Sequence, residues 1–177
     1  MRRALYILGQ LNETDIRWMV QTGARRTVEP GTMLVEAGKT PADVYIVMDG
    51  GLAVQTEAGA DIARLAAGDI VGEMSLIEKR PPAVSVVATE TSVVLAVPQA
   101  ATEARLAADD GFAARFYRAL AVFLSDRLRT TVSQMGYGEP GGPTPMADDG
   151  ELDEGVLDSL HVAGERMRRL ASITRRE

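Results

Sequence analysis

Cysteine is absent from the 177 residues of this chain. Disulfide bonds, thiolate metal sites and a Cys–His nucleophile pair are therefore excluded, and the composition fits a reducing compartment. No apolar run reaches the roughly 18 residues that a membrane-spanning helix needs. The N-terminal segment MRRALYILGQL is too short, and too soon followed by polar residues, to be a signal peptide. We expect a cytoplasmic protein without a membrane span.

Histidine is nearly absent, since His161 is the only one. A catalytic metal in a β-barrel needs clustered histidine and carboxylate ligands, which one histidine does not supply. A Ser–His pair would have to recruit His161 from near the C-terminus, and a position on a helix face is the simpler interpretation. We expect no catalytic residue, no metal site and no resident cofactor, and therefore no enzyme.

Positive charge is scarce as well, because 25 acidic and 19 basic residues leave a formal net charge of −6. A negative balance disfavours general affinity for nucleic acid, whose phosphates attract basic proteins. Apolar residues make up 46% of the chain, enough for a buried core. The length fits one domain of usual size plus an appendage.

Short apolar runs separated by glycine turns fill the centre of the chain. They recur at intervals of about eight to twelve residues, which is typical of an antiparallel sandwich or barrel. Few of them alternate strictly, which favours a compact barrel resembling a jelly roll. The first predicted strand ends at the Pro30-Gly31 turn. The others span residues 32–36, 44–48, 52–56, 61–65, 70–71, 84–88 and 92–97.

Helical spacing flanks this region on both sides. Residues 4–24 are predicted to be helical, with Asn12 or Thr14 capping a second segment that ends at Gly23. After the strands, Asp109 or Asp110 caps a long helix. Its apolar face contains all three phenylalanines of the chain. This face either packs on the barrel or in part pairs with a second subunit.

The composition changes abruptly at residues 136–150, GYGEPGGPTPMADDG, which contain five glycines and three prolines. This is typical of a flexible linker between a domain of residues 1–135 and the tail. In residues 151–177 a narrow apolar seam predicts an amphipathic helix that docks into a groove or pairs with another helix. The seam consists of Leu152, Val156, Leu160, Ala163, Met167 and Leu170.

Residues 65–85, LAAGDIVGEMSLIEKRPPAVS, are the most informative for function. After the turn at Gly68-Asp69, the pair Gly72-Glu73 opens a short apolar segment that can form one helical turn. A glycine beside a carboxylate in this position suits a sugar phosphate. Free backbone N–H groups face the phosphate, and the carboxylate accepts hydrogen bonds from a ribose hydroxyl.

Taken in order, these motifs resemble the cyclic nucleotide-binding domain of bacterial catabolite activators, kinase regulatory subunits and gated channels. The resemblance covers about residues 5–132 and rests on residues 29–38, 44–50, 52–54, 65–76 and 123–127. It implies a mainly β fold. An eight-stranded antiparallel β-roll would be flanked by N-terminal helices, a long C-terminal helix and here a tail helix.

The resemblance also assigns roles in a phosphate-binding cassette. Glu73 would accept hydrogen bonds from the ribose, and Gly72 would let the backbone approach the sugar. Met74 and Ser75 would present N–H groups to the cyclic phosphate, and Ser85 would contact phosphate or base. The residues expected to bind the ligand are Val71, Gly72, Glu73, Met74, Ser75, Arg80, Pro82, Ala83, Val84 and Ser85.

One position departs from the family pattern. Where the family commonly has an arginine that pairs with the phosphate, nine residues after the glutamate, this chain has Pro82. Loss of a charge-assisted hydrogen bond would weaken binding about tenfold to more than a hundredfold. Arg80, two residues upstream, either supplies the missing guanidinium or is a solvated loop residue. Lys79 is a weaker candidate because it lacks a bidentate fork.

Three functions follow as hypotheses. The first is a regulatory module that binds a cyclic mononucleotide, cAMP rather than cGMP, and signals through its C-terminal helices. The second is a protein-interaction module with a degenerate pocket, which self-associates or binds a partner through the long helix and tail. A DNA-binding regulator is disfavoured, because about 40 residues remain after the long helix and a linker takes many of them.

Overall fold

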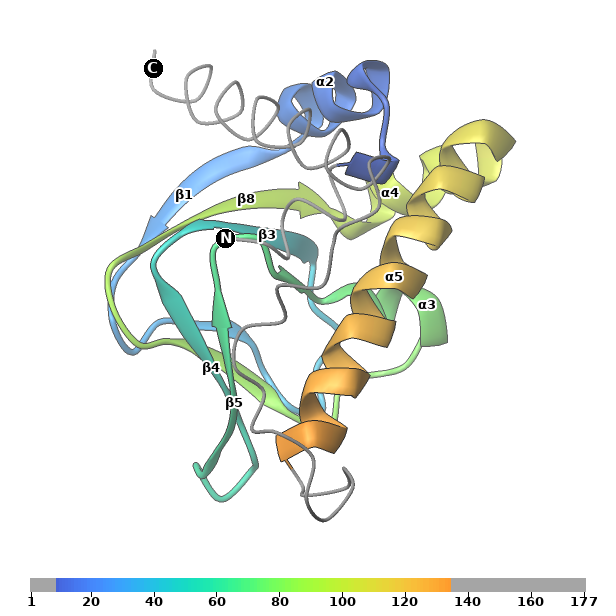
Figure 1. Cartoon of the computed structure of the whole chain (residues 1–177). Coiled ribbons are helices and arrows are strands. Elements are labelled where there is room, and N and C mark those ends of the chain that lie inside the picture. The colour runs from blue at the N-terminus through green and yellow to red at the C-terminus, as the bar shows by residue number, and fades with distance from the viewer. Residues whose placement is uncertain (1–8, 135–177) are drawn as a thin grey trace.

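The computed structural model describes residues 9–134 of the chain. The first predicted helical residues, the linker 136–150 and the tail 151–177 with His161 lie outside the described residues. Within residues 9–134, eight antiparallel strands form two four-stranded sheets, with strand orders β1-β8-β3-β6 and β2-β7-β4-β5. The eight-stranded β-roll with helical flanks is therefore confirmed (Figure 1).

The strands lie where the glycine turns predicted them. The first sheet contains β1 (Ala24–Val28), β8 (Ser92–Pro98), β3 (Asp43–Asp49) and β6 (Ile70–Val71). The second contains β2 (Met33–Val35), β7 (Ser85–Ala88), β4 (Gly51–Gln55) and β5 (Asp61–Ala66). Turn glycines such as Gly31 and Gly68 have φ of +85° and +100°, a backbone conformation that favours glycine.

Alternate residues of β3 belong to two separate cores. Tyr45 and Val47 face inward and pack with residues of the second sheet, such as Leu52. Val44 and Ile46 face the other way and pack against helices. Because side chains alternate across a strand, one sheet thus closes the roll on one side and supports a helical layer on the other.

The helical layer consists mainly of α2 (Glu13–Thr22) and α5 (Asp110–Gln134). Asn12 caps α2 and Gly23 ends it, as predicted. Asp109 accepts a hydrogen bond from the Phe112 N–H, 2.8 Å, and so caps α5. The three phenylalanines of α5 are buried in the core against the first sheet. The Phe face therefore packs on the barrel, and α5 runs along one side of the roll (Figure 1).

Residues 99–108, for which the sequence patterns gave no helix, form α4 (Gln99–Ala108). It starts directly after β8, and its N-cap Pro98 makes no side-chain capping bond. The familiar start signal was therefore absent. Helix α4 matters because it supplies Arg105 to a polar cluster that joins three helices.

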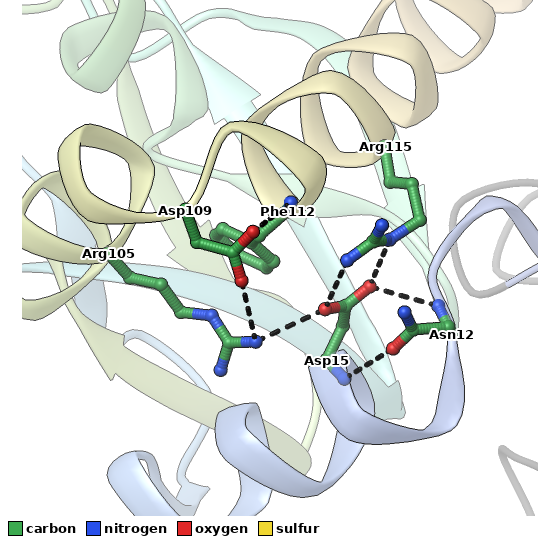
Figure 2. Close-up of polar contacts among 6 residues, drawn as sticks. All are labelled: Asn12, Asp15, Arg105, Asp109, Phe112 and Arg115. Atoms are coloured by element: carbon green, nitrogen blue, oxygen red, sulfur yellow. Dashed lines mark hydrogen bonds and ion pairs between the residues drawn. The ribbon is translucent and has the colours of Figure 1, made fainter.

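This cluster is centred on Asp15 of α2, which is fully buried (Figure 2). Its carboxylate accepts two hydrogen bonds from Arg115 of α5, at 2.7 and 3.0 Å, and one from Arg105, at 3.2 Å. The Arg105 guanidinium also lies 4.6 Å from the Trp18 ring centroid and 4.4 Å from that of Phe112. These contacts fix the first half of α5 against α2 and α4.

Candidate functional site

A cavity lies between the second sheet, β6, α3 (Glu73–Glu78) and α5. Its volume is about 60 Å³, far below the roughly 300–1,000 Å³ of typical ligand pockets. Apolar side chains form its wall, and the polar ones come from α3 and α5. The lining residues are Val35, Val54, Leu65, Ile70, Val71, Gly72, Glu73, Met74, Ser75, Pro82, Val84, Val86 and Arg127.

Gly72 joins β6 to α3 in a conformation that only glycine adopts without strain. Its φ is +88°, and a Cβ atom at this position would lie 2.9 Å from the backbone oxygen of Asp43. Both the left-handed backbone and the close approach of β3 therefore require glycine. The turn places the first residues of α3 at the mouth of the cavity.

Glu73, the first residue of α3, points inward and is only 3% exposed. Burial raises the pKa of its carboxyl group, and the nearby Asp69 carboxylate adds to this increase. Hydrogen bonds from the N–H groups of Glu73 and Met74 and the positive charge of Arg127 oppose it. The carboxylate thus already engages its own residue's N–H and the Met74 N–H, and the sequence analysis had expected the latter to face a ligand.

Ser75 carries the most informative polar atom in the cavity. The residue is 2% exposed, and its Oγ has no hydrogen-bond partner among the described residues. Leaving a buried hydroxyl unpaired costs about 1–3 kcal/mol. A polar group that enters the cavity and bonds to this hydroxyl would remove that cost.

Arg127 of α5 is a site residue that the sequence analysis missed. Its guanidinium lies 3.9 Å from the Glu73 carboxylate and 5.9 Å from the Phe123 ring centroid, and its side chain is 27% exposed. Only the FLSDR motif, which contributed to the family resemblance, pointed to this segment. The residue is 54 positions from Glu73, so no local pattern could reveal the contact.

The predicted site residues divide into two groups. The structure brings together in the cavity Val71, Gly72, Glu73, Met74, Ser75, Pro82 and Val84. The other three do not line it. Arg80 is 73% exposed at its side chain and pairs with Glu78, and Ala83 is exposed. Ser85 accepts a hydrogen bond from the Ala37 N–H, 3.0 Å, which ties β7 to the turn after β2.

Two kinds of feature are absent from the described residues. Within residues 9–134 no group of histidine, aspartate or glutamate side chains is arranged to hold a metal ion. Over the same stretch, no helix is long and apolar enough to cross a membrane.

Comparison with known families agrees with this geometry. Residues 25–109 match the family model of the cyclic nucleotide-binding domain. A search of curated proteins finds no significant match.

Several solved structures share the fold. A cyclic nucleotide-binding domain from Methylobacillus flagellatus KT is 20% identical, with a TM-score of 0.67 and coverage of 80% of this chain and 85% of the other. The catabolite activator protein of Thermus thermophilus is 20% identical, with a TM-score of 0.58 and coverage of 94% and 87%. The domain CBD2 of PKAR, bound to Sp-2Cl-cAMPS, is 14% identical, with a TM-score of 0.58 and coverage of 75% and 84%.

Proposed function

We propose that the chain, whose residues 25–109 match the family model of the cyclic nucleotide-binding domain, is a non-enzymatic regulatory module that binds a cyclic mononucleotide beside α3. The observation that carries the proposal is the buried hydroxyl of Ser75, a residue that lines the cavity, because this hydroxyl has no hydrogen-bond partner among the described residues. A cyclic phosphate oxygen there would accept its hydrogen bond. The cAMP analogue bound to the domain CBD2 of PKAR supports the choice of ligand class.

Glu73 is suited to hold the sugar. Its carboxylate is buried in the cavity wall, at the start of α3 directly after the Gly72 turn. An ionised carboxylate accepts hydrogen bonds from hydroxyl groups, and these bonds are stronger than neutral ones. Because burial raises the pKa of Glu73, binding through this carboxylate is expected to weaken as the pH falls toward its titration range.

Arg127 supplies the cation that Pro82 cannot. It is the only arginine or lysine lining the cavity among the described residues, whereas the Arg80 side chain is 73% exposed and paired with Glu78. A phosphate in the cavity would compete with the Glu73 carboxylate for the Arg127 guanidinium. Because Arg127 belongs to α5, the same contact would report ligand binding to the long helix.

The present cavity volume of about 60 Å³ is too small for a nucleotide. Binding therefore requires the second half of α5 to shift away from α3, while the Asp15 cluster holds its first half against α2. A ligand that binds the shifted arrangement of α5 more tightly would raise the population of that arrangement. The domain would then act as a two-state switch, as expected of a sensor. The output would leave the domain through α5 and the tail.

The chemistry of the cavity wall favours cAMP over cGMP. Away from α3 and Arg127 the lining side chains are hydrocarbon, from residues such as Val54, Leu65 and Val86. Guanine carries one more exocyclic polar group than adenine, and an unpaired buried polar group costs about 1–3 kcal/mol. Without a polar partner on the wall, adenine is the less costly base to bury.

Calorimetric titration of the full chain with cAMP, cGMP and 5′-AMP tests the proposal. We expect cAMP to bind and to exceed cGMP in affinity. Arg127→Gln should weaken cAMP binding about tenfold to a hundredfold, the loss of one charge-assisted hydrogen bond. Arg129→Gln, an exposed arginine of the same helix, is the matched control and should leave affinity unchanged. Arg80→Gln should behave like that control.

The small cavity and Pro82 also favour a second candidate, a domain whose pocket is degenerate and which works through protein contacts alone. The same titration separates the two. Absence of heat with every nucleotide up to millimolar concentration would remove the sensor and leave the interaction module. Self-association, measured by light scattering, would then be the function to examine.

A further inference from the structure

Helix α5 has an apolar stripe that is distinct from its buried phenylalanine face. Tyr117, Leu128 and Val132 are 48%, 64% and 38% exposed, although they are large apolar residues. Ala121 is exposed as well, and Leu124 is partly buried at the edge of the core. Read from the end of α5 backward, the stripe is Val132, Leu128, Leu124, Ala121 and Tyr117, with spacings of 4, 4, 3 and 4.

The tail repeats this spacing in the opposite direction. Its first five seam positions, read forward, also have spacings of 4, 4, 3 and 4: Leu152, Val156, Leu160, Ala163 and Met167. Such alternation of three and four residues is the pattern of two helices that pack along a narrow seam. We propose that the tail docks on the α5 stripe of its own chain as an antiparallel helix, with Val132 opposite Leu152 and Tyr117 opposite Met167.

This register matches residue sizes as well as spacings. Ala121 stands opposite Ala163, so the two smallest side chains meet at one level and allow the helices to approach closely. At the other levels large side chains pair, including Leu124 with Leu160 and Leu128 with Val156. A parallel arrangement does not match all five positions, because the forward spacings of the stripe are 4, 3, 4 and 4.

The connection is long enough for docking within one chain. The stripe spans about 22 Å at 1.5 Å per residue. The 19 residues between Val132 and Leu152 would have an end-to-end distance of about 22–26 Å as a flexible chain, more than the 8–10 Å between packed helices. Such a tether gives an effective concentration in about the millimolar range, which favours the chain's own tail over a second copy.

The docking specifies how the proposed output would pass through α5 and the tail. It rests on that part of the proposed function alone. Because the chain has no native cysteine, a pair of introduced cysteines reports the contact in the full chain. Leu128→Cys with Val156→Cys places two thiols at one level of the proposed seam. Under mild oxidation at micromolar protein without nucleotide, we expect an intrachain disulfide.

The control pair is Leu128→Cys with Asp158→Cys, two residues further along the tail and so on the opposite side of the predicted helix. The seam pair should cross-link at least tenfold faster than this control. Adding Leu160→Lys should reduce the rate to the control rate, whereas Ser159→Lys should not. Equal rates for the two pairs would overturn the docking, and covalent dimers would assign the stripe to a second copy. Neither result bears on nucleotide titration.

Discussion

Replacing Asp15 by asparagine tests how the helices are held together. The carboxylate accepts three hydrogen bonds from Arg105 and Arg115, at 2.7 to 3.2 Å, and a fourth from the Asn12 N–H at 3.0 Å. Asparagine keeps the size of the side chain but removes the charge. Its amide group also turns a donor toward guanidinium donors. Two arginines would then lack their buried counter-ion.

The size of the effect follows from burial. Breaking a buried ion pair by removing one partner costs about 3–5 kcal/mol. The Arg115 side chain is 34% exposed and can partly rehydrate, so we expect Asp15→Asn to lower the free energy of unfolding by about 2–4 kcal/mol. Arg17→Gln in the same helix removes an exposed pair with Glu13, at 3.8 Å, and should cost less than about 0.5 kcal/mol.

Urea unfolding of both variants at several pH values is the assay. Burial alone would raise the pKa of Asp15, but hydrogen bonds from Arg115 and the Asn12 N–H, together with the two positive charges, outweigh it and lower the pKa from its usual 3.8. The stabilisation is therefore present above pH 3.8 and lost as the pH falls through the lowered value. A loss below about 0.5 kcal/mol at pH 7, or a difference that persists at acid pH, would refute this reasoning.

Four further variants test the site, a turn and the core by the same assay. Gly72→Ala should cost about 2–4 kcal/mol, because φ of +88° and a contact of 2.9 Å with the Asp43 oxygen both oppose a Cβ atom. Gly31→Ala, at φ +85° with nothing within 4 Å, should lose only about 1–2 kcal/mol. Burial raises the pKa of Glu73 above its usual 4.5, so its stabilising effect is present below pH 4.5 and lost as the pH rises through the raised value. Glu73→Gln should abolish this decrease in stability with rising pH. A variant whose stability has the same pH profile as the original chain would contradict the reasoning. Phe116→Ala, at a fully buried position, should cost about 3–5 kcal/mol, and a cost near zero would exclude it from the core.

Local chemistry made much of the fold predictable. The strands lie near the predicted positions because glycine turns separate runs of β-branched residues, and these signals act within a few residues. The Asn12 cap and the Asp109 cap were predictable for the same reason. In contrast, α4 begins after Pro98 without a side-chain cap, so no local signal marked its start.

Local sequence patterns predicted only part of the candidate site. The segment 71–75 was predictable because its residues are contiguous and meet at one turn. Arg127 was not, because its approach to Glu73 depends on how the phenylalanine face of α5 packs against the first sheet. The outward position of Arg80, paired with Glu78, likewise followed from the path of its loop.

The sequence alone determined the order of the strands, the glycine that opens α3 and the carboxylate that follows it, because these depend on neighbours along the chain. Only the tertiary structure decided that this carboxylate is buried, that an arginine 54 residues away lies beside it, and that the cavity between them has a volume of only about 60 Å³. Those properties arise from packing between distant segments, and packing depends on every side chain in the interface at once.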